Sequence, residues 1–89
     1  MNEKLLRYAT IKMLLETRQI NTLDQIFNYV PYQQVAADLK MGESHLRKIV
    51  ADTTEMKMLE IFELAHLIGC SEEIIMHMAA DQFLVGKKQ

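Results

Sequence analysis

Residues 32–50, YQQVAADLKMGESHLRKIV, decide the fold of this chain. They predict two short helices, 32–40 and 43–51, broken at Gly42, and each has an apolar residue at nearly every helical turn. The apolar residues of the two helices are Val35, Ala36, Leu39, Leu46, Ile49 and Val50. Neither helix is long enough to bury such a stripe alone. We therefore expect the two helices to wedge against one another at a steep angle.

The opposite side of the second helix is polar. Its outer residues would be Ser44, His45, Arg47 and Lys48. In a helix-turn-helix, the second helix projects such a face into the major groove of DNA. Arg47 could read guanine through a bidentate hydrogen-bond pair, and Lys48 could hold a phosphate; the alternative is two solvated surface charges. The motif predicts a DNA-binding regulator.

The rest of the chain predicts an all-α fold. One Pro and three Gly are too few for an all-β protein, and no long segment alternates with period two. The compact bundle of five to six short helices would form a single domain, 1–89. Helices are expected at about 3–19, 22–30, 32–40, 43–51, from Thr53 or Thr54 to Ile68, and from Ser71 onward, with Gly86 to Gln89 as a frayed tail.

Local signals set the expected helix ends and buried faces. Thr22 with Gln25 matches a capping box, and Gly69 suits a left-handed helix terminus. Pro31 should end the second helix. The last two helices should turn inward Met58, Leu59, Ile61, Phe62, Ala65 and Ile68, and then Ile74, Ile75, Met78, Ala79 and Phe83.

From Thr22 to Phe83 the order of elements resembles the Cro/repressor (lambda-repressor-like, XRE-type) helix-turn-helix domain. The resemblance rests on VAADLKMGESHLRKI at 35–49 and MLEIFELAHLIGCSEEII at 58–75. It implies a repressor-like five-helix core at 22–84, preceded by an extra N-terminal helix within 1–20. Such domains bind operator DNA as dimers and regulate transcription.

The chain departs from the family pattern in two places. Lys40 stands where the family usually has glycine, so it should either adopt a left-handed conformation or lengthen the turn. The extra helix could cover the core, mediate dimerisation, or add Arg7, Lys12 and Arg18 to the DNA face.

Further contacts are expected around the second helix of the motif. Gln33 and Lys40 would fix the phosphate register, although Gln33 and Gln34 could equally be surface polar residues. Tyr32 could hold phosphate through its hydroxyl. Glu43 would be repelled by phosphate unless it accepts a bond from cytosine, and it could simply cap the helix.

Charge leaves DNA binding possible. Ten Lys and Arg against twelve Asp and Glu give a net charge of −2, whereas nucleic-acid-binding domains are often basic. The N-terminal part is basic and residues 59–82 are acidic, so the molecule should be polarised. With one Cys, no signal peptide and no membrane-spanning apolar run, we expect a cytoplasmic protein.

No enzyme chemistry is evident. Cys70, His66 and His77 lack zinc-like spacing, and Cys70 should pack as a small residue. We expect no metal, cofactor or small-molecule substrate. The expected partners are double-stranded DNA and a second copy of the chain. The alternative is a protein–protein interaction module that has kept the helical fold and lost DNA binding.

Overall fold

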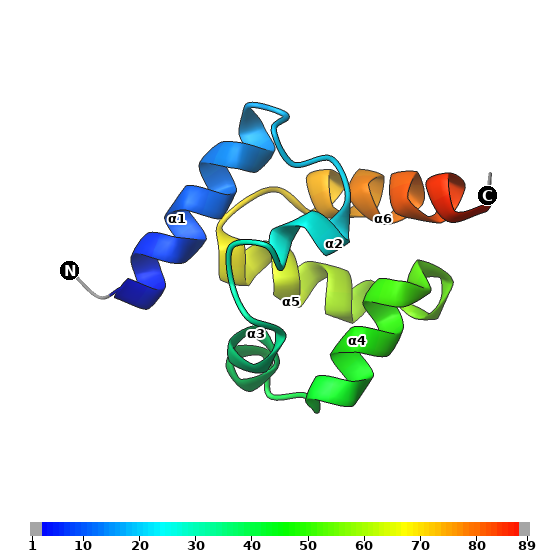
Figure 1. The fold of residues 1–89 in the computed structure, drawn as a ribbon, viewed down its shortest axis with the longest axis horizontal. Helices are drawn as coiled ribbons and strands as arrows, with labels where there is room; N and C mark the ends of the chain where they lie inside the picture. The colour runs from blue at the N-terminus through cyan, green and yellow to red at the C-terminus, as the bar shows by residue number, and fades with distance from the viewer. Residues whose placement is uncertain (1–2, 88–89) are drawn as a thin grey trace.

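The computed structural model describes residues 3–87, and every regular element within them is helical (Figure 1). The all-α prediction is confirmed. The elements are α1 (Glu3–Glu16), α2 (Leu23–Ile26), α3 (Tyr32–Leu39), α4 (Glu43–Ala51), the 3₁₀ turn η1 (Thr53–Glu55), α5 (Met58–Ile68) and α6 (Glu72–Lys87).

Helix α1 ends at Glu16, three residues before the predicted end. Arg18 adopts a left-handed conformation with φ 61°. The N–H of Gln19 then reaches back to the carbonyl of Leu14 at 2.8 Å, and the N–H of Arg18 donates to the carbonyl of Leu15 at 3.2 Å. This pair of bonds satisfies carbonyls that a helix end leaves free, which is why the chain leaves the helix here.

Helix α2 is much shorter than predicted. Its start is as expected, because the Gln25 side-chain carbonyl accepts bonds from the backbone N–H groups of Asn21 at 2.7 Å and Thr22 at 3.3 Å. Residues 27–29 form only turns, whose N–H groups bond to carbonyls three residues earlier. Pro31 disfavours the helical conformation in the residue before it, which restricts the chain just beyond these turns.

The predicted cap of α5 is wrong. Thr53 and Thr54 lie in η1, where the Thr53 hydroxyl donates to the Ala79 carbonyl at 2.7 Å and ties this turn to α6. Helix α5 begins only at Met58, and the Glu60 carboxylate accepts the free backbone N–H of Lys57 at 2.8 Å. The segment between α4 and α5 is therefore a separate element.

The core lies around α5, which crosses the middle of the molecule in Figure 1 and packs against α6, α1 and α3. Every α-helix contributes buried apolar side chains to it, and no polar or charged residue of the described part is buried. The largest side chains that are fully buried are Ile11, Leu23, Ile26, Leu46, Ile49, Leu64, Ile75, Val30, Val35 and Val50.

The predicted inner face of α5 is partly wrong. Ile61, Ala65 and Ile68 are buried as expected, and they are joined by Leu64, which the prediction omitted. Met58, Leu59 and Phe62 are instead 54%, 67% and 45% exposed. The sequence MLEIFELAHLI is apolar on several sides, so its periodicity does not distinguish the buried stripe from the outer one.

Helix α6 follows its prediction more closely. It begins directly after Ser71, and Ile75, Met78 and Ala79 are buried. Ile74 is half-buried, whereas Phe83 is 40% exposed because the end of the helix extends past the core. Gly69 ends α5 in the left-handed conformation, with φ 89°, as predicted. Of the predicted frayed tail, Gly86 and Lys87 continue the α6 helix, and residues 88 and 89 lie outside the described residues.

Candidate nucleic-acid interface

Helices α3 and α4 are joined by a turn of three residues, 40–42, and cross at a steep angle (Figure 1). Lys40 takes the left-handed conformation, with φ 58° and ψ 42°. The N–H of Met41 donates to the Ala36 carbonyl at 2.9 Å and closes the end of α3. Of the two outcomes expected for a non-glycine residue here, the left-handed one is found.

Gly42 contributes no unusual conformation to this turn. Its φ of −71° and ψ of 146° are open to any residue, and a Cβ at this position would contact nothing within 4 Å. The break that the sequence suggested at Gly42 is therefore made at Lys40, two residues earlier. Gly42 simply precedes the first turn of α4.

Helix α4 separates its two faces completely. Leu46, Ile49 and Val50 are at most 1% exposed. The opposite face carries Ser44, His45, Arg47 and Lys48, all of which are exposed. The buried face fixes the helix on the core, so its position does not depend on any residue of the outer face.

The six predicted contact residues all lie on the surface, on two helices and at the turn between them. Four of them share the outer side of α4. Gln33 is exposed in the first turn of α3, and Lys40 is exposed at the opposite end of the same helix. The structure therefore places Gln33 and Lys40 at opposite ends of α3.

Carboxylates pair with two of the α4 side chains. Glu43 accepts from Arg47 Nε at 2.9 Å within the helix. Glu60, at the start of α5, lies 2.6 Å from His45 Nε2. Among the described residues, Lys48 has no such partner. The outer face of α4 is thus accessible but less positive than its sequence suggests.

Glu60 is the electrostatic link between α4 and α5. Burial alone would raise the pKa of its carboxyl, but hydrogen bonds from the Lys57 backbone and the His45 ring outweigh burial and lower the pKa below its ordinary value. The ionised carboxylate is therefore favoured in the folded protein. Its contact with His45 holds one end of α4 against α5.

An aromatic pair supports Arg47 from below. The Phe27 and Tyr32 rings are parallel, with centroids 3.9 Å apart. The guanidinium carbon of Arg47 lies over the Tyr32 ring, 4.3 Å from its centroid. From the sequence, only the hydroxyl of Tyr32 was expected to make a contact. No pattern in the sequence predicts this contact, because it depends on how α2, α3 and α4 meet.

The extra helix α1 covers the core and is anchored to α3. Its buried residues are Tyr8, Ile11, Leu14 and Leu15. The Tyr8 hydroxyl donates to Asp38 Oδ2 at 2.5 Å, and Arg7 Nη1 donates to Gln34 Oε1 at 3.1 Å. Burial, together with Asp38, raises the pKa of Tyr8, so the phenol keeps its proton for this bond.

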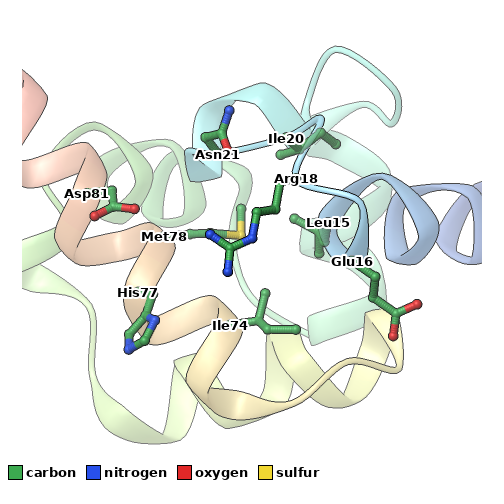
Figure 2. Close-up of a pocket in the computed structure, with 9 residues that line it drawn as sticks. All are labelled: Leu15, Glu16, Arg18, Ile20, Asn21, Ile74, His77, Met78 and Asp81. Carbon is green, nitrogen blue, oxygen red and sulfur yellow. The ribbon is translucent and has the colours of Figure 1, made fainter.

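The three N-terminal basic residues considered for the DNA face, Arg7, Lys12 and Arg18, do not join the α4 face as a group. Arg7 reaches α3, whereas the stem of Lys12 lies near Gly69. Arg18 lines a pocket of about 240 Å³ between the end of α1 and α6, where Figure 2 shows its side chain extending towards Ile74 and Met78. Most of the cationic surplus of the N-terminal part thus lies away from α4.

The pocket of Figure 2 has no evident chemistry. Its polar side chains, Glu16, Arg18, Asn21, His77 and Asp81, are all exposed. Across residues 3–87, no three side chains of the types that ligate metals come together. Cys70 is half-buried, and burial raises the pKa of its thiol, which disfavours the reactive thiolate. His66 is exposed.

Comparison with known proteins gives no relative: no family model, no curated protein and no solved structure matches this chain. Among the described residues, no helix is long and apolar enough to cross a membrane.

Proposed function

We propose that the protein is a sequence-specific, dimeric DNA-binding regulator of transcription that uses α3 and α4 as a helix-turn-helix. The observation that carries this proposal is the division of α4 into a fully buried apolar face and an exposed polar face. The major groove is about 12 Å wide and admits an α-helix, whose diameter with side chains is about 10–12 Å. With nine residues, α4 is about 13 Å long. Arg47, Lys48, Ser44 and His45 would contact DNA there.

The ion pair between Arg47 and Glu43 does not prevent this role. The two side chains are 57% and 43% exposed. Exposed pairs of this kind contribute less than about 1 kcal/mol, because water already solvates both charges. A guanine or a phosphate can therefore replace Glu43 as the partner of Arg47, at the cost of leaving Glu43 near the DNA.

A dimer would present two copies of α4 to successive major grooves, about one helical turn apart. The end of α6 is the proposed contact. Leu84 and Val85 are more than half exposed there, and Phe83 is 40% exposed. The Gln82 amide bonds to the Val50 carbonyl at the end of α4, so a contact through this end of α6 would bring the two α4 helices together.

The test is a salt titration of binding to DNA fragments from the neighbourhood of its own gene. Each phosphate contact contributes roughly −0.9 to the slope of log K against log salt. Arg47→Ala with Lys48→Ala should therefore weaken binding and make the slope less steep by about 1, for the phosphate contact of Lys48. Lys12→Ala with Arg18→Ala removes the same charge away from α4 and should change the slope little. Absence of binding by the unaltered protein at low salt would contradict the proposal.

The second candidate is a protein-interaction module, and the apolar outer side of α5 favours it. Met58, Leu59 and Phe62 expose about half of their surface or more. If this candidate is right, deleting the gene should cause a defect, and the Arg47→Ala, Lys48→Ala variant should correct that defect. The variant with Leu59→Ser and Phe62→Ser should fail to correct it.

A further inference from the structure

Three side chains from three segments of the chain form a column beneath the outer face of α4. Phe27 follows α2, Tyr32 is the first residue of α3, and Arg47 belongs to α4. The Phe27 and Tyr32 rings are 3.9 Å apart and inclined by only 5°. Since Phe27 covers one face of the Tyr32 ring, the guanidinium at 4.3 Å occupies the other face.

The base of this column is rigid. Phe27 is half-buried and packs against the hydrophobic core. Pro31, directly before Tyr32, has φ −67° and holds the backbone in an extended conformation at the start of α3. Phe27 thus holds one face of the Tyr32 ring, and Pro31 restricts the backbone directly before it. The other face of the ring is a defined surface for a cation.

Arg47 is held at two points and is free at a third. Its guanidinium carbon lies over the Tyr32 ring, and its Nε donates to Glu43 Oε2 at 2.9 Å. Among the described residues, its two Nη groups have no hydrogen-bond partner. These groups form the edge with which arginine makes a bidentate pair to O6 and N7 of guanine.

We propose that Tyr32 is a positioning residue for base recognition: it holds the Arg47 guanidinium so that its Nη edge selects a guanine in the major groove. This inference rests on the proposed DNA-binding function and assigns the base class read by Arg47. A long, flexible arginine side chain normally loses its freedom on binding. Here the stack orders it before DNA arrives, so the preference for guanine depends on the ring face of Tyr32.

The experiment is selection of bound sequences from a random DNA library, followed by affinity measurement on the selected site and on variants of its guanine. Tyr32→Phe keeps the ring face and should keep the preference. Tyr32→Leu keeps apolar bulk against Phe27 but offers no ring to the cation. It should lower the discrimination for guanine at one position by about two- to fivefold, the range of an exposed cation–π contact.

Two further variants separate positioning from a general structural effect. Arg47→Ala removes the bidentate donor and should lower the same discrimination by about tenfold. In the Arg47→Ala background, Tyr32→Leu should cause no further loss, because its effect acts through the guanidinium. Tyr29→Leu removes an exposed tyrosine three residues away and should leave the base preference unchanged.

The outcomes distinguish the two claims. If the unaltered protein enriches no sequence, the proposed function is wrong and this inference fails with it. If it enriches a motif and Tyr32→Leu keeps the full preference for guanine, the inference alone is overturned. An equal loss from Tyr32→Leu with and without the Arg47→Ala substitution would also overturn it, since Tyr32 would then act on the fold.

Discussion

The helix pairs α3–α4 and α5–α6 are built alike and differ in how clearly their sequences assign their faces. Each pair is joined through a residue in the left-handed conformation, Lys40 in the first and Gly69 in the second. In α4 the apolar residues form one stripe, and the remaining surface is polar. In α5 apolar residues lie on several sides, and Leu59 is two-thirds exposed.

This difference shows what amphipathic patterning can and cannot specify. Where one stripe is apolar, only one orientation buries it, and α4 adopts that orientation. Where several stripes are apolar, the neighbours decide, and α5 turns Ile61, Leu64 and Ile68 towards them. The surplus apolar residues remain on its surface, where they can serve a contact with another molecule.

The largest expected effect contrasts a leucine of each pair. Leu46→Ala empties a fully buried position and should lower the free energy of unfolding by about 2–5 kcal/mol, because it removes packing and leaves a cavity. Leu59→Ala should change it by less than about 0.5 kcal/mol. Urea unfolding followed by circular dichroism measures both. If Leu59→Ala instead lowers the free energy of unfolding strongly, and by an amount that depends on protein concentration, another copy of the chain covers α5.

The two left-handed termini should respond in opposite directions. Gly69→Ala should destabilise the protein by about 1 kcal/mol, because a Cβ is disfavoured at φ 89°. The cost is conformational, since the nearest atom to that Cβ, on Lys12, would lie at 3.9 Å. Lys40→Gly removes the same kind of strain and should stabilise the protein. The gain should be less than about 1 kcal/mol, because glycine also increases the conformational freedom of the unfolded chain.

Thermal unfolding of the two variants measures this contrast, with Gly42→Ala as the matched control in the same turn. Gly42 has an ordinary φ of −71° and open space around it. Its replacement should therefore change stability little, because the lower entropy of the unfolded chain is offset by the preference for glycine over alanine at a helix N-cap. If Lys40→Gly destabilises the protein, the Lys40 side chain stabilises the fold by more than the left-handed backbone at this position destabilises it.

The smallest expected effect concerns the contact between the pairs, where Glu60 meets His45. Because the pKa of Glu60 is lowered in the folded protein, its ionised form stabilises the fold above the ordinary value of 4.5, and this contribution is lost as the pH falls through the lower folded value. Glu60→Gln should thus be less stable than the unaltered protein near pH 7. Denaturant unfolding from pH 7 to pH 3 should show the difference shrinking, and a constant difference would exclude this linkage.

Much of the fold was predictable because local signals agreed with tertiary packing. The starts of α3, α4 and α6, the end of α5 and the outer side of α4 all follow from capping, glycine or periodicity. The end of α1 was missed because Arg18 carries no sign of a left-handed conformation. Likewise, Thr53 and Thr54 are good capping residues, but the hydroxyl of Thr53 is used by α6 instead.

The candidate site was predictable in its residues but not in their partners. Arg47, Lys48, Ser44 and His45 share an exposed helix face, as the 3.6-residue period requires. Glu60 is 15 residues from His45 in the chain, and Tyr32 is 15 residues from Arg47. Contacts over such separations have no local pattern, so neither pair could be inferred from the sequence.

The sequence alone determined that this chain is helical, that α3 and α4 pack through one apolar stripe each, and that α4 turns a polar side outward. These properties follow from helical periodicity, which acts over a few residues. Only the tertiary structure decided which stripe of α5 is buried, that His45 of α4 meets Glu60 of α5, and that Phe27 and Tyr32 support Arg47. Those outcomes depend on the relative placement of whole helices, which is set by the packing of the core.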